Sequence, residues 1–153
     1  MENYTFIYKK IPETSLEKYI SGFEALNIVS ENGLTADWHP ITFWTGKNDE
    51  EIPLYQNYIL KDKGISLRKI PYSEEPVFIA NFPRAIADLI YYEYEKTPHR
   101  FRNIANDFLS EKEKKELFEY LLEIRKEKNI EDFLIQEFSK EYYQFRKQNK
   151  KVV

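Results

Sequence analysis

The sequence predicts an α+β fold, in which a small sheet from the first half of the chain packs against several helices of the second half. Short runs of β-branched and aromatic residues lie before residue 81, whereas most stretches with three- and four-residue apolar spacing follow it. Strands and helices that are segregated along the chain are typical of α+β folds rather than doubly wound sheets. A length of 153 residues fits one domain, so we expect residues 1–153 to form a single domain.

In the first half, residues 5–9 are predicted to form a strand, because they are β-branched or aromatic with weak alternation. A helix is predicted next, from Thr14 to the Asn32–Gly33 pair. Thr14 and Glu17 have the spacing of a capping box, and Asn-Gly suits a helix C-terminus. The apolar face of this helix is predicted to comprise Leu16, Tyr19, Ile20, Phe23 and Leu26.

Three more strands are predicted at residues 41–46, 65–70 and 77–80. The segment 65–70 alternates apolar and polar residues, as a half-buried strand does. The segment 77–80 is apolar at every position, which favours a central place in the sheet.

The remainder is predicted to be helical. A long apolar face begins at Phe82, with Pro83 in the first turn, and a short helix follows the interruption at Pro98. Ser110 and Glu113 form a second capping box that opens the next helix. Asn129 is predicted to cap one continuous last helix over residues 130–148.

Composition narrows the classes of function. The absence of cysteine excludes disulfides, thiolate nucleophiles and cysteine-ligated zinc, and it suits a cytoplasmic location. The N-terminus lacks the pattern of a signal peptide, and no apolar run approaches membrane-spanning length. A net charge of −3 argues against a general nucleic-acid binder. No glycine-rich phosphate loop occurs, so we expect no cofactor, and no feature of the sequence sets an oligomeric state.

Asp37 and His39 are the candidates for an acid–base or metal-binding pair. A small metal-dependent nuclease or hydrolase built on them, with carboxylates from elsewhere, is therefore an alternative. Only one other histidine exists, and no pair has zinc-ligand spacing. A packed histidine is the favoured interpretation, and we assign no catalytic residue and no metal site.

Arg84 and Asp88 lie four residues apart on an otherwise apolar helix and can therefore pair. An exposed pair of this kind would contribute only about 0.3–0.5 kcal/mol. We expect instead that Asp88 is partly buried and that Arg84 is its partner.

Surplus aromatic residues in the helical half predict a surface for a protein partner, because tyrosine and arginine are frequent anchors of interfaces. The acidic loop at Asp49–Glu51 is a competing surface, which would mimic phosphate charge. The residues predicted to bind a partner are Tyr91, Tyr92, Arg100, Arg102, Tyr142 and Tyr143.

Residues 15–95 resemble AbiEi-type antitoxins of abortive-infection (type IV toxin–antitoxin) systems. The resemblance rests on a strand that ends in a small residue, a proline-containing turn, and a helix with a basic residue and Asp-Leu. An upstream helix, a Gly-Leu pair and a threonine-bearing strand extend it. These features correspond here to Ala80, Pro83, Arg84, Ala85, Ile86, Asp88 and Leu89, with Ala25, Leu26, Gly33, Leu34 and Thr42 upstream.

The resemblance implies a non-enzymatic protein that counters a nucleotidyltransferase-type toxin by binding it. Family members usually have proline followed by an acidic residue before the basic one, whereas Phe82-Pro83 stands here. They also usually carry an N-terminal winged helix that binds operator DNA, and this chain starts almost directly in the resembling region, so DNA-binding autoregulation is not expected. A phage-encoded inhibitor of a host defence nuclease is an alternative with the same acidic, cysteine-free profile.

Overall fold

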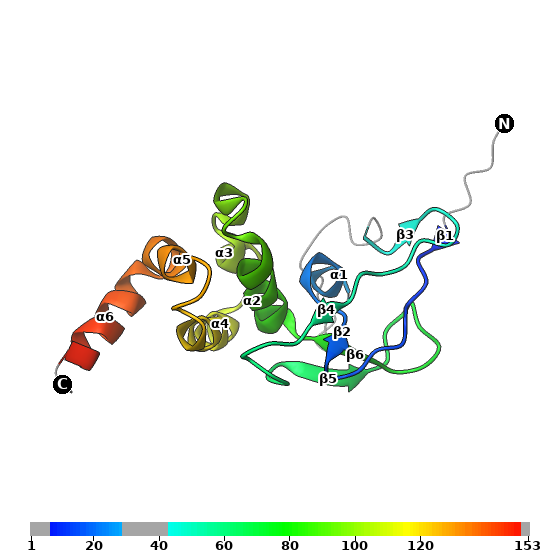
Figure 1. Cartoon of the computed structure of the whole chain (residues 1–153), viewed down its shortest axis with the longest axis horizontal. Helices are drawn as coiled ribbons and strands as arrows, with labels where there is room; N and C mark the ends of the chain where they lie inside the picture. Colours follow the sequence, from blue (N-terminus) through cyan, green and yellow to red (C-terminus); the bar gives the residue numbers. More distant parts are fainter. Residues whose placement is uncertain (1–6, 29–42, 151–153) are drawn as a thin grey trace.

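The computed structural model describes residues 7–28 and 43–150. Its elements confirm the α+β fold, with strands in the first half of the chain and most of the helix in the second (Figure 1). In chain order they are β1 Ile7–Tyr8, β2 Lys18–Tyr19, α1 Gly22–Leu26, β3 Thr45–Gly46, β4 Tyr55–Gln56, β5 Ile65–Arg68, β6 Val77–Ala80, α2 Phe82–Glu93, the 3-10 turn η2 Pro98–Phe101, α3 Ile104–Phe108, α4 Glu111–Glu123, α5 Ile130–Glu137 and α6 Ser139–Lys150.

The strands form short antiparallel pairs: β1 with β3, β2 with β4, and β5 with β6. A bridge at the end of β2 joins two of these pairs. The amide of Ile20 donates to the carbonyl of Phe78, and the amide of Ala80 donates to the carbonyl of Ile20, over 3.0 and 2.8 Å. Strand β6 therefore lies between β5 and the end of β2, which is the central place that its apolar sequence predicts.

The helix predicted from Thr14 is wrong at its start, because the chain there forms β2 and only the short helix α1. The Thr14 hydroxyl accepts from the amide of Phe78 across the sheet instead of capping a helix. The Ser15 hydroxyl accepts from the amides of Glu17 and Lys18, which makes a turn. The predicted helix end at Asn32–Gly33 lies outside the described residues. Residues 41 and 42 of the predicted strand 41–46 also lie outside them, and the described part of that segment forms a strand only at its end, as β3.

Helix α2 is the central element of the molecule. Asn81 caps it by accepting from the amide of Arg84 at 2.9 Å, and Pro83 occupies the first turn as predicted. Its residues 83–90 are all buried, since α1 and β6 pack against it from one side and α4 from the other (Figure 1).

The last helical segment differs from the prediction of one continuous helix. Phe138 leaves the helical conformation, with φ −130° and ψ 39°, and separates α5 from α6. Its buried ring packs on Phe118 and Phe133, so burial of this ring accompanies the break. Asn129 adopts a left-handed conformation and makes no side-chain cap, contrary to the prediction, whereas the Ser110–Glu113 capping box is present. Among the described helices, none has the length and apolar character needed to cross a membrane.

Candidate functional site

Arg84 and Asp88 form a salt bridge in the interior of the protein. The guanidinium Nε lies 2.9 Å from the Asp88 Oδ1, and both side chains are 0% exposed. We expected partial burial of Asp88 from its apolar neighbours, and the structure shows that burial is complete for both partners.

Hydroxyl groups satisfy the remaining positions of the Asp88 carboxylate. Its Oδ2 accepts from the Tyr19 hydroxyl at 2.8 Å and from the Ser21 hydroxyl at 2.6 Å. Its Oδ1 accepts from the Tyr58 hydroxyl at 2.8 Å. With Arg84, the carboxylate has four donors, so little of its hydrogen-bonding capacity is unmet.

Every nitrogen of the Arg84 guanidinium also donates a hydrogen bond. It donates to the backbone carbonyl of Lys63 at 2.5 Å and to Asn57 Oδ1 and the Tyr19 hydroxyl at 3.0 Å each. Its carbon lies 5.3 and 5.2 Å from the ring centres of Tyr19 and Tyr58, within cation–π distance. These contacts join β2, the segment after β4 and the loop before β5 to helix α2.

The electrostatics follow from the burial of this network. Burial raises the pKa of the Asp88 carboxyl, while the Arg84 guanidinium and the hydrogen bonds from Ser21 and Tyr19 oppose that rise. Burial and the Asp88 carboxylate raise the pKa of the Tyr19 and Tyr58 hydroxyls above the ordinary tyrosine value. Since both charged side chains are sealed from solvent, the network holds the fold together and presents no surface to a ligand.

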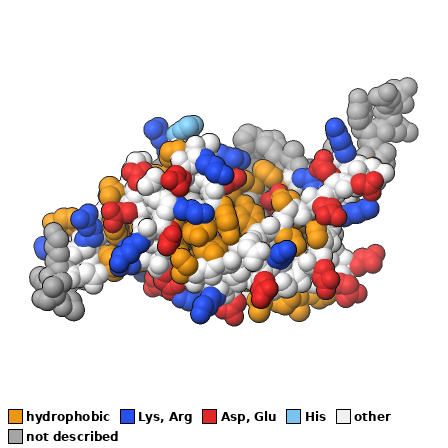
Figure 2. All heavy atoms as spheres, viewed as in Figure 1, with side chains coloured by type: hydrophobic (Ala, Val, Ile, Leu, Met, Phe, Trp, Pro, Cys, Tyr) orange, Lys and Arg blue, Asp and Glu red, His pale blue; other side chains and the backbone are white. Residues whose placement is uncertain are grey.

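A surface groove lies where α1, β4 and the end of α2 meet, and we call it the Tyr92 groove. Its volume is about 640 Å³. Figure 2 shows hydrophobic side chains gathered at the middle of one face of the molecule. The groove is lined by Phe23, Phe43, Pro53, Leu54, Tyr55 and Tyr92, with Glu24, Gln56, Glu93, Lys96 and Arg100 as polar lining.

Contacts within the wall hold the Tyr92 groove in shape. The Tyr92 hydroxyl donates to the carbonyl of Gln56 at 2.5 Å, and its ring meets Tyr55 edge-on at 5.7 Å. The Arg100 guanidinium lies 4.8 Å over the Phe23 ring and 4.0 Å from the Glu93 carboxylate. Burial raises the pKa of the Glu24 carboxyl. The groove thus offers apolar rings with one anchored cation and carboxylates beside it.

Of the six residues predicted to bind a partner, Tyr92 and Arg100 line the Tyr92 groove. Tyr142 and Tyr143 line a separate groove on α5 and α6. Arg102 is exposed just after η2 but does not line the groove. Tyr91 does not line the groove either, but its ring meets the Tyr92 ring edge-on at 5.0 Å, stacks on Tyr58 at 4.0 Å and lies 4.2 Å from the Lys128 ammonium.

Tyr142 requires a correction, because it is only 3% exposed and its hydroxyl donates to Glu131. It secures α6 to α5 and is not an exposed anchor. Tyr143 is 63% exposed, but it lies on α6, at the end of the molecule away from the strands (Figure 1). The six predicted residues therefore do not form one surface, because Tyr142 and Tyr143 lie on α6 while Tyr92 and Arg100 line the groove beside α1 and β4.

The part of the groove that comes from the first half of the chain, chiefly Phe23, Phe43 and Tyr55, was not predicted from the sequence. Their aromatic character was a signal. No sequence spacing relates them to Tyr92, because only the packing of α1 and β4 on α2 brings them there.

The other predicted sites have less support. Asp37 and His39 lie outside the described residues, and within residues 7–28 and 43–150 no group of three or more histidine, aspartate or glutamate side chains is placed to hold a metal. In the acidic loop, Asp49 pairs with Lys10 at 2.9 Å and Glu50 lies 3.7 Å from Lys9. These pairings reduce the negative charge that phosphate mimicry would need.

No protein-family model, curated protein or solved structure matches this chain. Support for a function therefore comes from the geometry of the Tyr92 groove and from the sequence features of residues 15–95.

Proposed function

We propose that this protein acts by binding a protein partner in the Tyr92 groove, and that the partner is a nucleotidyltransferase-type toxin. In this proposal the protein is a non-enzymatic, antitoxin-like component of a cytoplasmic defence system. The observation that supports it most is the groove itself, which is lined by aromatic rings from both halves of the chain and by Arg100, whose guanidinium lies over the Phe23 ring.

The character of the lining favours a protein over a nucleic acid. Aromatic and arginine side chains bury a large area while their polar atoms stay paired at the rim, which is typical of interface hot spots. Lys96 and Arg100 lie beside Glu24 and Glu93, so the charges are mixed. A nucleic-acid groove would instead present a continuous row of cations.

The class of partner is supported by the resemblance to AbiEi-type antitoxins. The resembling region, residues 15–95, supplies most of the groove, including Phe23, Tyr55 and Tyr92. It also supplies Arg84 and Asp88, whose buried pair joins the segments that present these rings. The region of the resemblance thus contributes most of the groove's lining, although the residues that carry the resemblance do not line the groove themselves.

The test is affinity capture from native lysate with the intact protein as bait, at low and high salt, followed by identification of the captured protein. We expect a nucleotidyltransferase-type protein at both salt concentrations, because an aromatic contact is little screened by ions. Arg100→Glu should abolish the capture, whereas Arg102→Glu, an equal change of charge at an exposed residue outside the groove, should not.

Two results would overturn parts of the proposal separately. If no partner is captured at either salt concentration, the protein does not work by stable complex formation. If the partner is a nuclease or another class of protein, and Arg100→Glu still abolishes binding, the groove remains the binding surface but the toxin assignment is wrong.

A further inference from the structure

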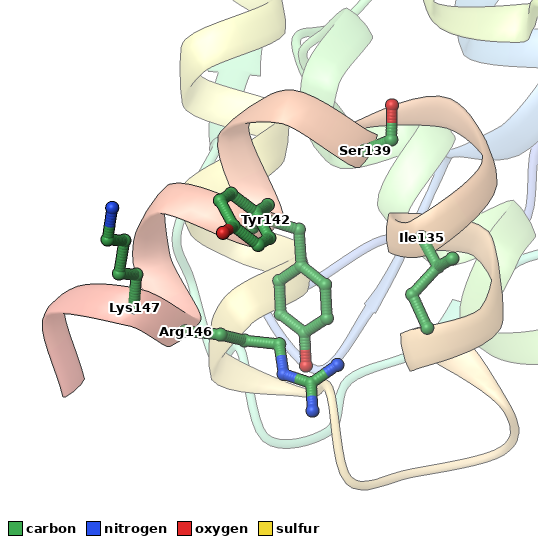
Figure 3. A pocket seen from close by; sticks show the side chains of 6 residues that line it. Ile135, Ser139, Tyr142, Arg146 and Lys147 are labelled. Carbon is green, nitrogen blue, oxygen red and sulfur yellow. The ribbon is translucent and has the colours of Figure 1, made fainter. Parts of the chain in front are cut away.

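A second groove runs along the outer face of α5 and α6, and it shares no residue with the Tyr92 groove. Its volume is about 430 Å³. Figure 3 shows the side chains that line it, which come from α5 and α6. They are Ile135, Ser139, Tyr142, Tyr143, Arg146 and Lys147, and we call this surface the α6 groove.

The break between α5 and α6 leaves apolar surface in contact with water. Ile135 is 45% exposed and Tyr143 is 63% exposed, although both are large apolar side chains. The residues of the groove on α6 recur every three or four positions, so they form one stripe along about two helical turns, roughly 12 Å long. Tyr142, which is 3% exposed, forms the buried edge of this stripe, and Tyr143 forms its outer edge.

The charge on the α6 groove is of one sign. Arg146 and Lys147 line it, and among the described residues no carboxylate does. The nearby Glu131 is engaged with the Tyr142 hydroxyl, and the Arg146 guanidinium lies 5.9 Å from the Tyr142 ring. A ligand of this groove therefore meets an apolar floor beside two cations.

This charge distribution discriminates between occupants. A second copy that presented the same face would bring Arg146 and Lys147 near their own counterparts, which like-charge repulsion opposes. A nucleic-acid strand needs cations spaced along its phosphates, and this groove offers two at one end of an apolar stripe. An acidic protein segment satisfies both features.

We propose that the α6 groove binds an acidic amphipathic helix of a partner protein. An apolar side chain of that helix packs on Ile135 and Tyr143, as in other helix-in-groove contacts. A carboxylate within one helical turn of that apolar side chain pairs with Arg146 and with Lys147. The planar guanidinium of Arg146 is suited to two parallel hydrogen bonds. The proposal does not depend on the Tyr92 groove or on the identity of its partner.

The test is selection from a displayed library of randomised helical peptides of about 12 residues against the intact protein. We expect the selected peptides to place an apolar residue within one turn of Asp or Glu. The strongest binder is then synthesised with a fluorescent label and titrated by polarisation against the wild type and against the double variant Arg146→Glu, Lys147→Glu. The double variant should weaken binding by about tenfold or more.

Two comparisons make the result specific. The double variant Lys112→Glu, Lys126→Glu changes the same charge at exposed residues outside the groove and should leave binding unchanged. A Tyr143→Ala variant should also weaken binding, and circular dichroism melting checks that every variant is folded. The proposal is overturned if no peptide is enriched, if the groove variants bind equally well, or if a thymidine oligonucleotide binds while acidic peptides do not.

Discussion

The buried pair of Arg84 and Asp88 explains at the residue scale why a charged pair stands on an apolar helix. The pair links distant segments, because Asp88 accepts from Tyr19 and Ser21 while Arg84 donates to Asn57 and to the carbonyl of Lys63. Two hydrophobic residues could fill the same volume, but they could not satisfy these polar groups, which would then lie buried without partners.

Replacing Asp88 by alanine should therefore be strongly destabilising. It leaves a buried guanidinium without its counter-ion, which costs about 3–5 kcal/mol. The free energy of unfolding, measured in urea, checks this. Glu111→Ala is the matched control, since it breaks an exposed helical pair with Lys114 and should cost less than about 1 kcal/mol. If Asp88→Ala lowers the free energy of unfolding by as little as the control does, the role assigned to the buried pair is wrong.

At the scale of elements, the corner between β2 and α1 decides how the first half of the chain folds. Gly22 opens α1, separated from β2 by Ile20 and Ser21, and has a left-handed backbone, with φ +61°. A side chain there would meet the hydroxyl of Tyr55 on β4. This residue lets the chain leave the sheet and enter α1 at once, which places Phe23 in the Tyr92 groove.

Gly22→Ala should destabilise the protein by about 1–3 kcal/mol, because alanine is strained at this backbone conformation and collides with Tyr55. Gly46→Ala is the control, since its backbone is not left-handed and only the flexible end of Glu50 must move. We expect Gly46→Ala to lower the free energy of unfolding less, by no more than about 1 kcal/mol. Equal losses of unfolding free energy at the two glycines would show that conformation is not the cause.

At the scale of the whole molecule, α2 couples the strands to the later helices, since it packs against α1 and β6 and also against α4. The network around Asp88 lies on the strand side of this helix. We therefore expect residues 1–153 to unfold as one cooperative domain.

Alkaline unfolding tests this expectation. The pKa values of Tyr19, Tyr55 and Tyr58 are raised, chiefly by burial, so the folded state favours their neutral forms. Their contribution to stability is present in full below the ordinary tyrosine pKa of about 10 and is lost as pH rises above it.

The measurement follows tyrosine ionisation by ultraviolet absorbance and helix content by circular dichroism in one titration. Tyrosines in contact with water should ionise first. Tyr19, Tyr55 and Tyr58 should ionise together with the loss of helix, although they lie in the strand half. Ionisation of the buried tyrosines with the helical signal intact would instead indicate two independently folding halves.

The sequence by itself determined the elements that depend on local patterns. Strand β6 followed from its apolar run, α2 from its apolar face and Pro83, and the start of α4 from the Ser110–Glu113 capping box. The pairing of Arg84 with Asp88 followed from their spacing of four residues, because one helical turn brings such side chains together.

Only the tertiary structure decided what depends on contacts between distant segments. It formed β2 where local spacing favoured a helix, because Thr14 and Ile20 bond to the strand at Phe78–Ala80. It ended α5 at Phe138, whose ring is buried between other aromatic rings, and it turned Tyr142 inward and Tyr143 outward. It also assembled the Tyr92 groove from residues of both halves. Burial and long-range hydrogen bonds outweigh helical propensity, and neither is encoded in the spacing of neighbouring residues.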